Sequence, residues 1–167
     1  MPDSRARGFS ILELLLTLAI VLCLAAFLAP SVRPATDKLK QVKALTECRR
    51  LGDAMFAWSV VQGGVPTPTI ENGTIAMAAY NEIKPGYLAE LLIPNYVTRV
   101  PKLDPWGRPY RYYLDFNDPA GPDAVACWSG GSDGGEPESY YEIGSFSPAD
   151  KAADILWADG EFLRWPE

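Results

Sequence analysis

The carboxylate of Glu13 lies where a charge is least expected, because it is the only charged side chain between Gly8 and Arg33. The apolar run FSILELLLTLAIVLCLAAFL, residues 9–28, surrounds it. A charge among apolar groups costs several kcal/mol unless an opposite charge is near, so acids within membrane segments usually have a function. The natural partner is a cation supplied by another chain. Glu13 therefore predicts a paired charge at a contact between chains.

The rest of the composition excludes several classes of chemistry. The 167 residues contain no histidine, which removes Ser-His-Asp triads, Cys-His dyads and histidine metal ligands. The 3 cysteines are too widely spaced for a zinc motif or a disulfide-dense scaffold. A net charge of -6 argues against nucleic-acid binding, which needs a basic surface.

The apolar run is long enough to cross a bilayer, since about 20 helical residues cover about 30 Å. A cleaved secretory signal fits the charged leader, but Phe27 and Pro30 flank a poor cleavage site. The residues directly before Cys23 are Ile20, Val21 and Leu22, and the lack of a small residue beside the cysteine argues against a lipoprotein signal. A plain membrane anchor stays open, although it leaves Glu13 unexplained.

Gly8 stands directly before Phe9, and the acid Glu13 follows four residues later. With Pro30 at the end of the apolar helix, this pattern resembles the type IV prepilin signal of pilins and pseudopilins. The resemblance implies that a membrane prepilin peptidase cuts between Gly8 and Phe9 and then methylates the Phe9 amino terminus. It also implies that Glu13 neutralises the Phe9 amino terminus of a neighbouring subunit, and that Pro30 loosens the assembly helix.

The next segment has the pattern of an amphipathic helix. Apolar residues recur at three- and four-residue steps from Leu39 to Phe56, and Gly63-Gly64 would end the helix. Between Arg33 and Arg50 the net charge is +4. Three interpretations of this basic face stay open: a solvated helix surface, contact with anionic lipid, or contact with acidic heads in a polymer.

The C-terminal part is predicted to be mainly β-structure. The string VPKLDPWGRPYRY, residues 100–112, resembles the DPWGNPYQY signature of the major pseudopilin of type II secretion (general secretion pathway protein G). In that family it opens a small antiparallel sheet packed on the stem. The elements expected here are a short helix over 86–93, strands over 110–114 and 124–128, and a hairpin of 155–158 with 161–165 turning at Asp159-Gly160.

The glycine-rich segment Ser129–Gly135 lies where the same family has the start of its calcium loop. The resemblance implies Asp133 and Asp154 as calcium ligands, with Glu136 or Asp150 as substitutes. The intervening segment is longer than in the family, so a glycine-rich acidic surface turn without a metal stays open. No other cofactor is expected.

Two of the cysteines are expected to lie close together in the folded chain. Cys48 lies on the apolar stripe of the stem, and Cys127 lies in a strand expected to pack on that stem. A disulfide and two buried thiols both fit an oxidising compartment.

These observations predict an α+β, pilin-like fold, in which a long N-terminal helix packs on a small C-terminal antiparallel β-sheet. The expected parts are a cleaved leader (1–8), a transmembrane and assembly helix (9–30), an amphipathic stem (31–62) and a globular head (63–167). We expect a single pass through the inner membrane with the head in the periplasm, followed by entry into a periplasmic filament.

The resemblance implies a structural, non-enzymatic subunit of a pseudopilus that drives protein export by type II secretion. The implied partners are the prepilin peptidase, copies of the chain itself, other pseudopilins, the inner-membrane assembly platform and, before assembly, membrane lipid. No nucleic-acid partner is expected. A cytoplasmic ATPase, not this chain, would supply the energy.

Two alternatives to this function stay open. The first is a type IV pilin or minor pilin for adhesion, motility or DNA uptake, which the lack of a cysteine after Cys127 disfavours. The second, more remote, is a membrane-anchored periplasmic enzyme. Its candidate acids Asp115, Asp118 and Asp123 lie beside no nucleophile motif.

Overall fold

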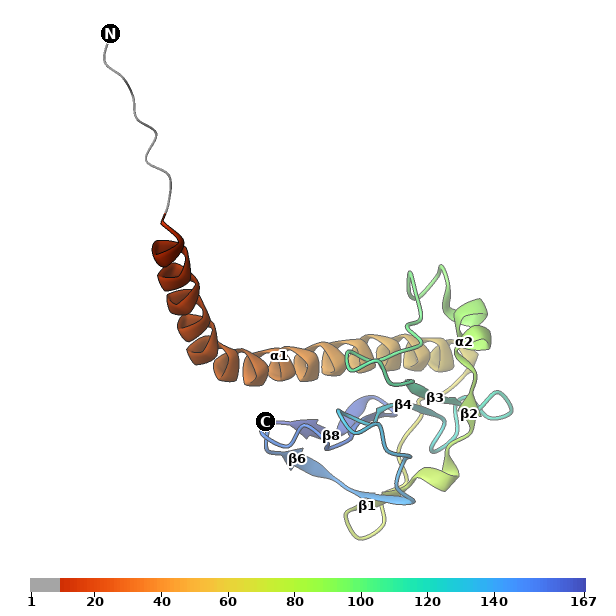
Figure 1. The fold of residues 1–167 in the computed structure, drawn as a ribbon. Helices are drawn as coiled ribbons and strands as arrows, with labels where there is room; N and C mark the ends of the chain where they lie inside the picture. Colours follow the sequence, from red (N-terminus) through yellow and green to blue (C-terminus); the bar gives the residue numbers. More distant parts are fainter. Residues whose placement is uncertain (1–9) are drawn as a thin grey trace. The chain divides into compact units, whose positions relative to one another are not determined.

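The computed structural model describes residues 10–167, except for the side chains of residues 26–35. Two compact units, Met1–Asp37 and Lys38–Glu167, divide the chain. Helix α1 (Ile11–Gln62) begins in the first unit and ends in the second (Figure 1). In the first unit, the large apolar side chains described between Ile11 and Leu24 are exposed. In the described part of the chain, no helix combines the length and mean hydropathy that a membrane crossing requires.

The second unit contains all the strands that the structure describes. Its elements after α1 are β1 (Thr74–Ala76), the 3-10 helix η1 (Met77–Ala79), β2 (Glu82–Ile83), α2 (Pro85–Leu92), β3 (Arg111–Leu114), β4 (Val125–Ser129), β5 (Tyr140–Glu142), β6 (Gly144–Phe146), β7 (Ile155–Ala158) and β8 (Glu161–Pro166).

Six of these strands form one sheet in the order β2-β3-β4-β7-β8-β6, while β1 and β5 form a separate antiparallel ribbon. Neighbours in the large sheet are antiparallel, except that β6 runs parallel to β8 at the edge. The predicted α+β, pilin-like fold is confirmed. The sheet is mixed where a wholly antiparallel one was predicted, because the long segment after β4 returns to pair β6 alongside the last strand.

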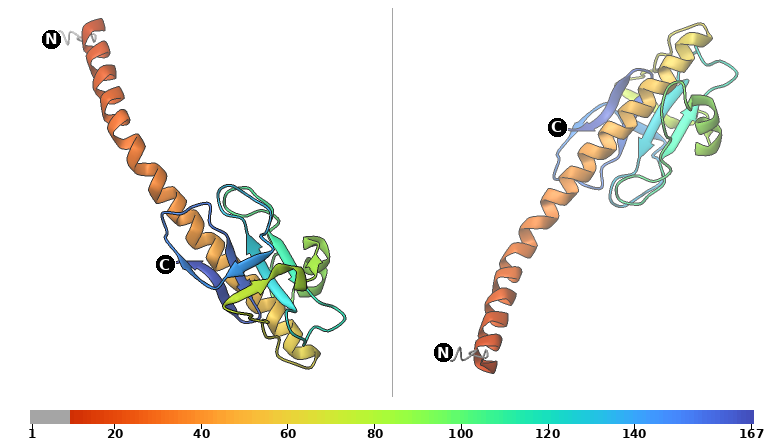
Figure 2. Two further views of the ribbon diagram at one scale, coloured as in Figure 1. Left: turned by 90° about the horizontal axis from the view of Figure 1, so that it is seen from below. Right: turned by 90° about the horizontal axis from the view of Figure 1, so that it is seen from above.

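The sheet is covered on both faces, and its strands alternate accordingly. In β4, Val125 and Cys127 point into the cluster that contains α1, whereas Ala126 and Trp128 point into the cluster that contains the β1-β5 ribbon. In β7, Ile155 and Trp157 alternate with Leu156 and Ala158 in the same way. Helix, sheet and ribbon therefore form three layers, and Figure 2 shows the helix running along the sheet.

The helix lies very close to the sheet at one glycine. A Cβ built on Gly52 would come within 2.2 Å of the Trp157 indole, so only a residue without a side chain fits there. On the same side of α1, Cys48, Leu51 and Met55 have no exposed surface. The helix ends at Gln62, and the following Gly63 has a φ of 125°, which favours glycine.

The Asp159-Gly160 turn between β7 and β8 confirms the predicted hairpin. Asp159 and Gly160 have φ angles of 44° and 111°, as a tight hairpin turn requires. The Asp159 carboxylate is buried and accepts hydrogen bonds from the Tyr80 hydroxyl (2.8 Å) and the Val125 N–H (2.9 Å). Burial raises the pKa of this carboxyl to about 6, although the two hydrogen bonds oppose the shift.

The predicted short helix and the strands at 110–114 and 124–128 are also present, within a residue of their expected bounds. The sequence did not predict β1, β2, β5 and β6. Each has only two or three residues, which is too short for an alternating pattern to be recognised.

Replacement of Gly52 by alanine is expected to destabilise the protein, because the new methyl group would collide with Trp157. Helix propensity alone would favour alanine by about 1 kcal/mol, and overpacking costs about 1–3 kcal/mol. A fall in the melting temperature of Gly52→Ala would therefore report the collision. The control is Gly86→Ala in α2, where nothing lies within 4 Å of the new Cβ, and it should melt no earlier than wild type. Equal melting temperatures for the two variants would contradict the packing.

Stability is expected to decrease as pH rises from about 4 to about 6, because Asp159 has a folded pKa of about 6 and an unfolded value near 3.8. The folded state binds more protons than the unfolded state in this window. The full effect of such a shift is roughly 3 kcal/mol. Asp154, whose pKa is also raised, contributes in the same direction.

Asp159→Asn keeps an acceptor for Val125 and removes one titrating group. Its urea midpoint should fall less than that of wild type between pH 4 and pH 7. Identical pH dependence in the two proteins would show that Asp159 does not titrate as described.

Candidate functional site

Glu13 is displayed on the outside of an apolar helix. It lies in the first turn of α1 and is exposed. The large neighbouring side chains Ile11, Leu12 and Leu14 are also exposed, at 79%, 77% and 64%. This part of the helix thus presents one carboxylate on an otherwise apolar surface, which is an arrangement that a cationic partner would stabilise.

The other residues predicted to act in processing and assembly cannot be compared with the structure. Gly8 and Phe9 lie outside the described residues, and so does the side chain of Pro30. The cleavage and pairing roles implied by the resemblance therefore stay predictions.

The DPWG segment is a rigid turn organised by the carboxylate of Asp104. One oxygen accepts hydrogen bonds from the backbone N–H groups of Trp106 (2.9 Å) and Arg108 (2.8 Å). The other accepts one from the Ser129 hydroxyl (2.9 Å), at the start of the glycine-rich segment. Gly107 has a φ of 84°, which explains why glycine follows the tryptophan. The turn therefore positions the beginning of the predicted calcium loop.

Within that loop, Gly131 packs against the backbone that precedes β7. A Cβ at this position would lie 2.7 Å from the carbonyl oxygen of Lys151 and 3.0 Å from those of Ala152 and Ala153. The N–H of Ser132 donates to the same Lys151 carbonyl at 2.8 Å. The absence of a side chain at Gly131 thus lets two distant loop segments touch, and it brings Asp133 toward Asp154.

The two loop segments enclose an open hollow of about 260 Å³. Its acidic lining residues are Asp133, Glu136, Glu138, Asp150 and Asp154. All four residues considered as calcium ligands from the sequence therefore lie around one hollow. The basic side chain that also lines it belongs to Arg164.

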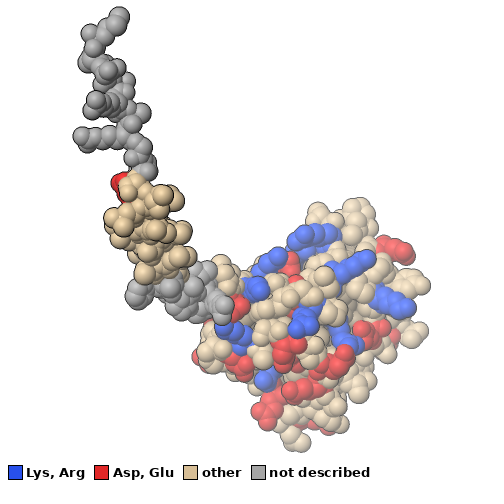
Figure 3. Space-filling view, in the orientation of Figure 1, with Lys and Arg blue, Asp and Glu red and all other residues tan. Residues whose placement is uncertain are grey.

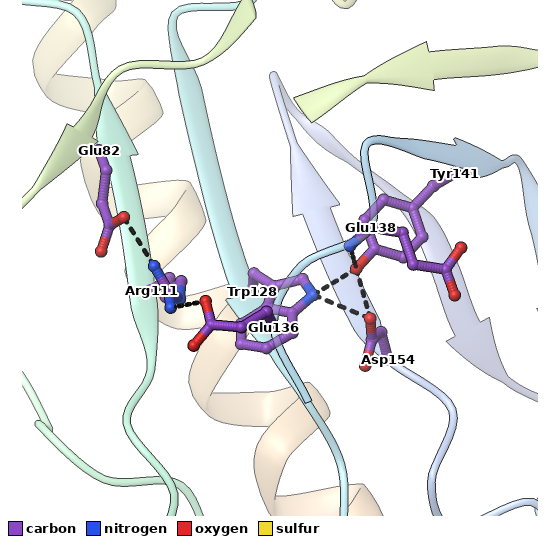
Figure 4. Close-up of polar contacts among 7 residues, drawn as sticks. All are labelled: Glu82, Arg111, Trp128, Glu136, Glu138, Tyr141 and Asp154. Atoms are coloured by element: carbon purple, nitrogen blue, oxygen red, sulfur yellow. Dashed lines mark hydrogen bonds and ion pairs between the residues drawn. The ribbon is translucent and has the colours of Figure 1, made fainter. Parts of the chain in front are cut away.

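Asp154 is the least exposed of these acids, and its carboxylate is held by two aromatic donors (Figure 4). One of its oxygens accepts hydrogen bonds from the Tyr141 hydroxyl and from the Trp128 indole N–H, the latter at 3.2 Å. The Tyr141 oxygen in turn accepts the backbone N–H of Glu138 at 2.9 Å. Burial raises the pKa of Asp154, and the negative charges of Asp133 and Glu138 add to the rise while its aromatic donors oppose it.

Glu136 has a different partner. It pairs with Arg111 of β3, whose guanidinium also contacts Glu82 at 2.9 Å (Figure 4). This arrangement attaches the loop to the edge of the sheet through one arginine and two carboxylates. Glu136 is thereby engaged in an ion pair, which leaves Asp133, Asp150 and Asp154 as the better candidate cation ligands.

Calcium binding at this hollow stays a prediction. Among the residues that the structure describes, no group of three or more Asp, Glu or Cys side chains is placed to hold one metal ion. The donor set is nevertheless made of oxygens, as calcium prefers. Asp133 and Asp154 are close enough to repel each other, which a divalent cation would relieve.

Sequence reasoning missed Arg111, Trp128, Glu138 and Tyr141, although all four contribute to the loop. The contacts of Arg111, Trp128 and Tyr141 with one another's segments span 13 or more residues, and no local pattern reveals such pairs. Glu138 joins them through its N–H bond to Tyr141, three residues away. The one available signal was the alternation of Glu138, Tyr140 and Glu142, which is typical of an exposed strand face.

Two of the acids considered for catalysis, Asp115 and Asp123, accept hydrogen bonds from the backbone of loops. Asp115 accepts hydrogen bonds from the N–H groups of Asn117 (2.7 Å) and Asp118 (3.2 Å), and Asp123 accepts that of Thr69 (2.7 Å). Such side chain to backbone bonds are the ordinary role of aspartate in loops.

Cys48 and Cys127 are both free thiols and both fully buried, in the core between α1 and the sheet. Burial raises the pKa of the Cys127 thiol, and interaction with Cys48 raises it further, so the two sulfurs are neighbours.

Comparison with known protein families indicates the general class to which this protein is similar. Residues 3–29 match a family model described as the prokaryotic N-terminal methylation motif. That motif, on a long N-terminal helix whose second half packs on a β-sheet, defines a pilin-like protein.

Curated relatives then narrow the class. The chain is similar to type II secretion system core protein G of Vibrio cholerae, with 29% identity over 79% of this chain and 86% of the relative. The core protein G of Klebsiella pneumoniae is 27% identical over 86% and 96% of the two chains. That of Pseudomonas aeruginosa is 27% identical over 87% and 99%. No solved structure matches the chain. The motif and these relatives confirm the predicted resemblance to the pseudopilins of type II secretion.

Proposed function

We propose that this chain is a pseudopilin, a non-enzymatic building block of a periplasmic filament that is assembled through its N-terminal helix. The observation that carries the proposal is the exposed Glu13 carboxylate among exposed apolar side chains at the start of α1. Such a surface is poorly suited to water and to lipid alike. It suits a contact in which apolar helices pack together and a cation neutralises the acid.

In this proposal a prepilin peptidase cuts between Gly8 and Phe9 and methylates Phe9. The new ammonium group then pairs with Glu13 of a neighbouring copy, and Pro30 loosens the helix as subunits associate. In a low-dielectric environment, burying the paired charges costs far less free energy than burying either one alone. Two helices therefore associate most favourably at the axial offset that brings the Phe9 ammonium next to Glu13. Apolar packing supplies most of the affinity.

The proposal extends to location and partners. Before assembly the chain is anchored in the inner membrane by its N-terminal helix, with the head in the periplasm. The inner-membrane platform of the secretion system would then add it to a filament with copies of itself and other pseudopilins. The methylation motif and the relatives support this sequence of events. The relatives are named for type II secretion rather than for pili, which favours export over the type IV pilin alternative.

Glu13→Ala is expected to be processed normally but to assemble poorly, because the Phe9 ammonium of the neighbour would have no counter-charge. Filament yield in cells that carry the rest of the secretion system should fall at least about tenfold, since an unpaired charge in the membrane costs about 3 kcal/mol. Mass spectrometry of the mature chain would check cleavage and methylation. Glu90→Ala, which removes an exposed acid from α2, is the matched control.

Replacement of Gly8 by a bulky residue should instead block processing and leave an uncleaved, membrane-bound precursor. Normal cleavage of that variant would refute the processing site, and a wild-type yield of filaments from Glu13→Ala would refute the pairing.

A separate proposal concerns calcium. We propose that Asp133 and Asp154 bind Ca²⁺ at the hollow between the two loop segments, with Asp150 close by. The oxygen lining and the mutual repulsion of the acids support this. When bound, the ion would neutralise these carboxylates and hold the loops together.

Calcium at about 100 times its dissociation constant should stabilise the full chain by about 2.7 kcal/mol and raise its melting temperature on the order of 5 °C relative to chelator. Asp133→Ala should abolish this gain, whereas Glu90→Gln should retain it. An equal melting temperature of the wild type in calcium and in chelator would remove the metal from the proposal without affecting the filament.

A further inference from the structure

The exposed side of α1 in the second unit carries a basic and apolar face. Its members are Leu39, Val42, Lys43, Arg49 and Arg50, which we call the stem face; all five are exposed. Lys43 and Arg50 are seven residues apart and therefore lie on the same side of the helix. Leu39 and Val42 are 69% and 52% exposed, so the face offers apolar area as well as charge.

The contacts of this face within its own chain are weak. Arg49 faces Asp53 at 3.8 Å with both side chains more than half exposed, and Arg50 donates to the Arg99 carbonyl at 3.4 Å. Surface pairs of this kind contribute about 0–1 kcal/mol. The positive charges therefore stay available to a second partner.

A complementary face lies on the β1-β5 ribbon. Glu138, Tyr140 and Glu142 alternate along β5 and its approach, and all three are exposed; we call them the ribbon stripe. Tyr141 between them points inward and is buried. The Tyr140 ring is 66% exposed. The three side chains border a hollow of about 390 Å³, which Thr74 and Arg164 complete.

The ribbon stripe has the chemistry of a receptor for basic side chains. Two carboxylates flank an exposed aromatic ring, and arginine and lysine bind both to carboxylates and to the faces of aromatic rings. The one cation of the hollow, Arg164, lies 5.8 Å from the centre of the Phe146 ring. Figure 3 shows the same separation on a larger scale, with Lys and Arg gathered along the side where α1 runs and most Asp and Glu toward the ribbon.

The two faces cannot meet within one copy. The stem packs on one face of the sheet and the ribbon on the other, as the two core clusters show. A contact between stem face and ribbon stripe must therefore join two copies. Each copy would use a different surface, and a contact of this kind builds an open filament when its rotation does not close into a ring.

We propose that the ribbon stripe Glu138-Tyr140-Glu142 of one copy binds the stem face around Lys43, Arg49 and Arg50 of a second copy. This inference rests on the proposed filament function and names the surfaces through which the heads join. Charge complementarity selects which surfaces of the two copies bind each other. Leu39, Val42 and Tyr140 lose exposed apolar surface in this contact.

Reversal of charge on each side, and then on both, tests the pairing in the full chain with its assembly system. Glu138→Lys with Glu142→Lys, and separately Arg49→Glu with Arg50→Glu, should each lower filament yield at least about tenfold, because like charges would then face each other. Combining all four substitutions should restore most of the yield. Glu90→Lys with Glu161→Lys changes the charge equally at exposed sites outside both faces and should assemble as wild type.

Two further measurements separate this interface from other effects. Melting temperatures of the variants should stay near that of wild type, and Glu142→Lys alone, which does not line the hollow of Asp133, should reproduce the loss without changing the response to calcium. Unchanged yield in either reversed pair, or no recovery in the combined variant, would overturn the interface while leaving the filament function intact. Failure of the wild type to assemble would overturn both.

Discussion

The contact between the second half of α1 and the sheet fixes where the other layers of the head can lie. Gly52 lets the helix approach the Trp157 indole, and Cys48, Leu51 and Met55 fill the space on either side. With one face of the sheet covered by the helix, the other is left for the β1-β5 ribbon. The strands β4 and β7 are consequently buried on both faces, and loops and edge strands carry the exposed chemistry.

The loop between β4 and β7 shows how this framework positions charge. Its beginning is attached to the Asp104 turn through Ser129, and its middle to β3 through Glu136 and Arg111. Its end is held by the bonds from Tyr141 and Trp128 to Asp154. These protein contacts order the loop and leave a row of acids on the surface. In the proposals above, Asp133 and Asp154 bind a cation within one copy, whereas Glu138 and Glu142 bind basic side chains of another copy.

Charge separation follows from the same layering. Residues 33–50 carry a net charge of +4 and residues 112–163 one of -10. The layers place α1 on one face of the sheet and the ribbon, with Glu138 and Glu142, on the other. A subunit with opposite charges on opposite sides is suited to association in one direction. Together with the acid at Glu13, this makes electrostatics the source of specificity, while apolar helices supply the affinity.

The amino-acid sequence was enough to predict the pilin-like class, the α+β fold, the hairpin at Asp159-Gly160 and the acids around the loop. These rest on local patterns: an acid in an apolar run, helical spacing, turn residues and a glycine-rich segment. The folded structure was needed to find the parallel pairing of β6 with β8, the partners of Arg111 and Asp154, and the placement of stem face and ribbon stripe on opposite sides of the sheet. Each of these joins residues distant in the chain, and such contacts depend on how the layers pack rather than on neighbouring residues.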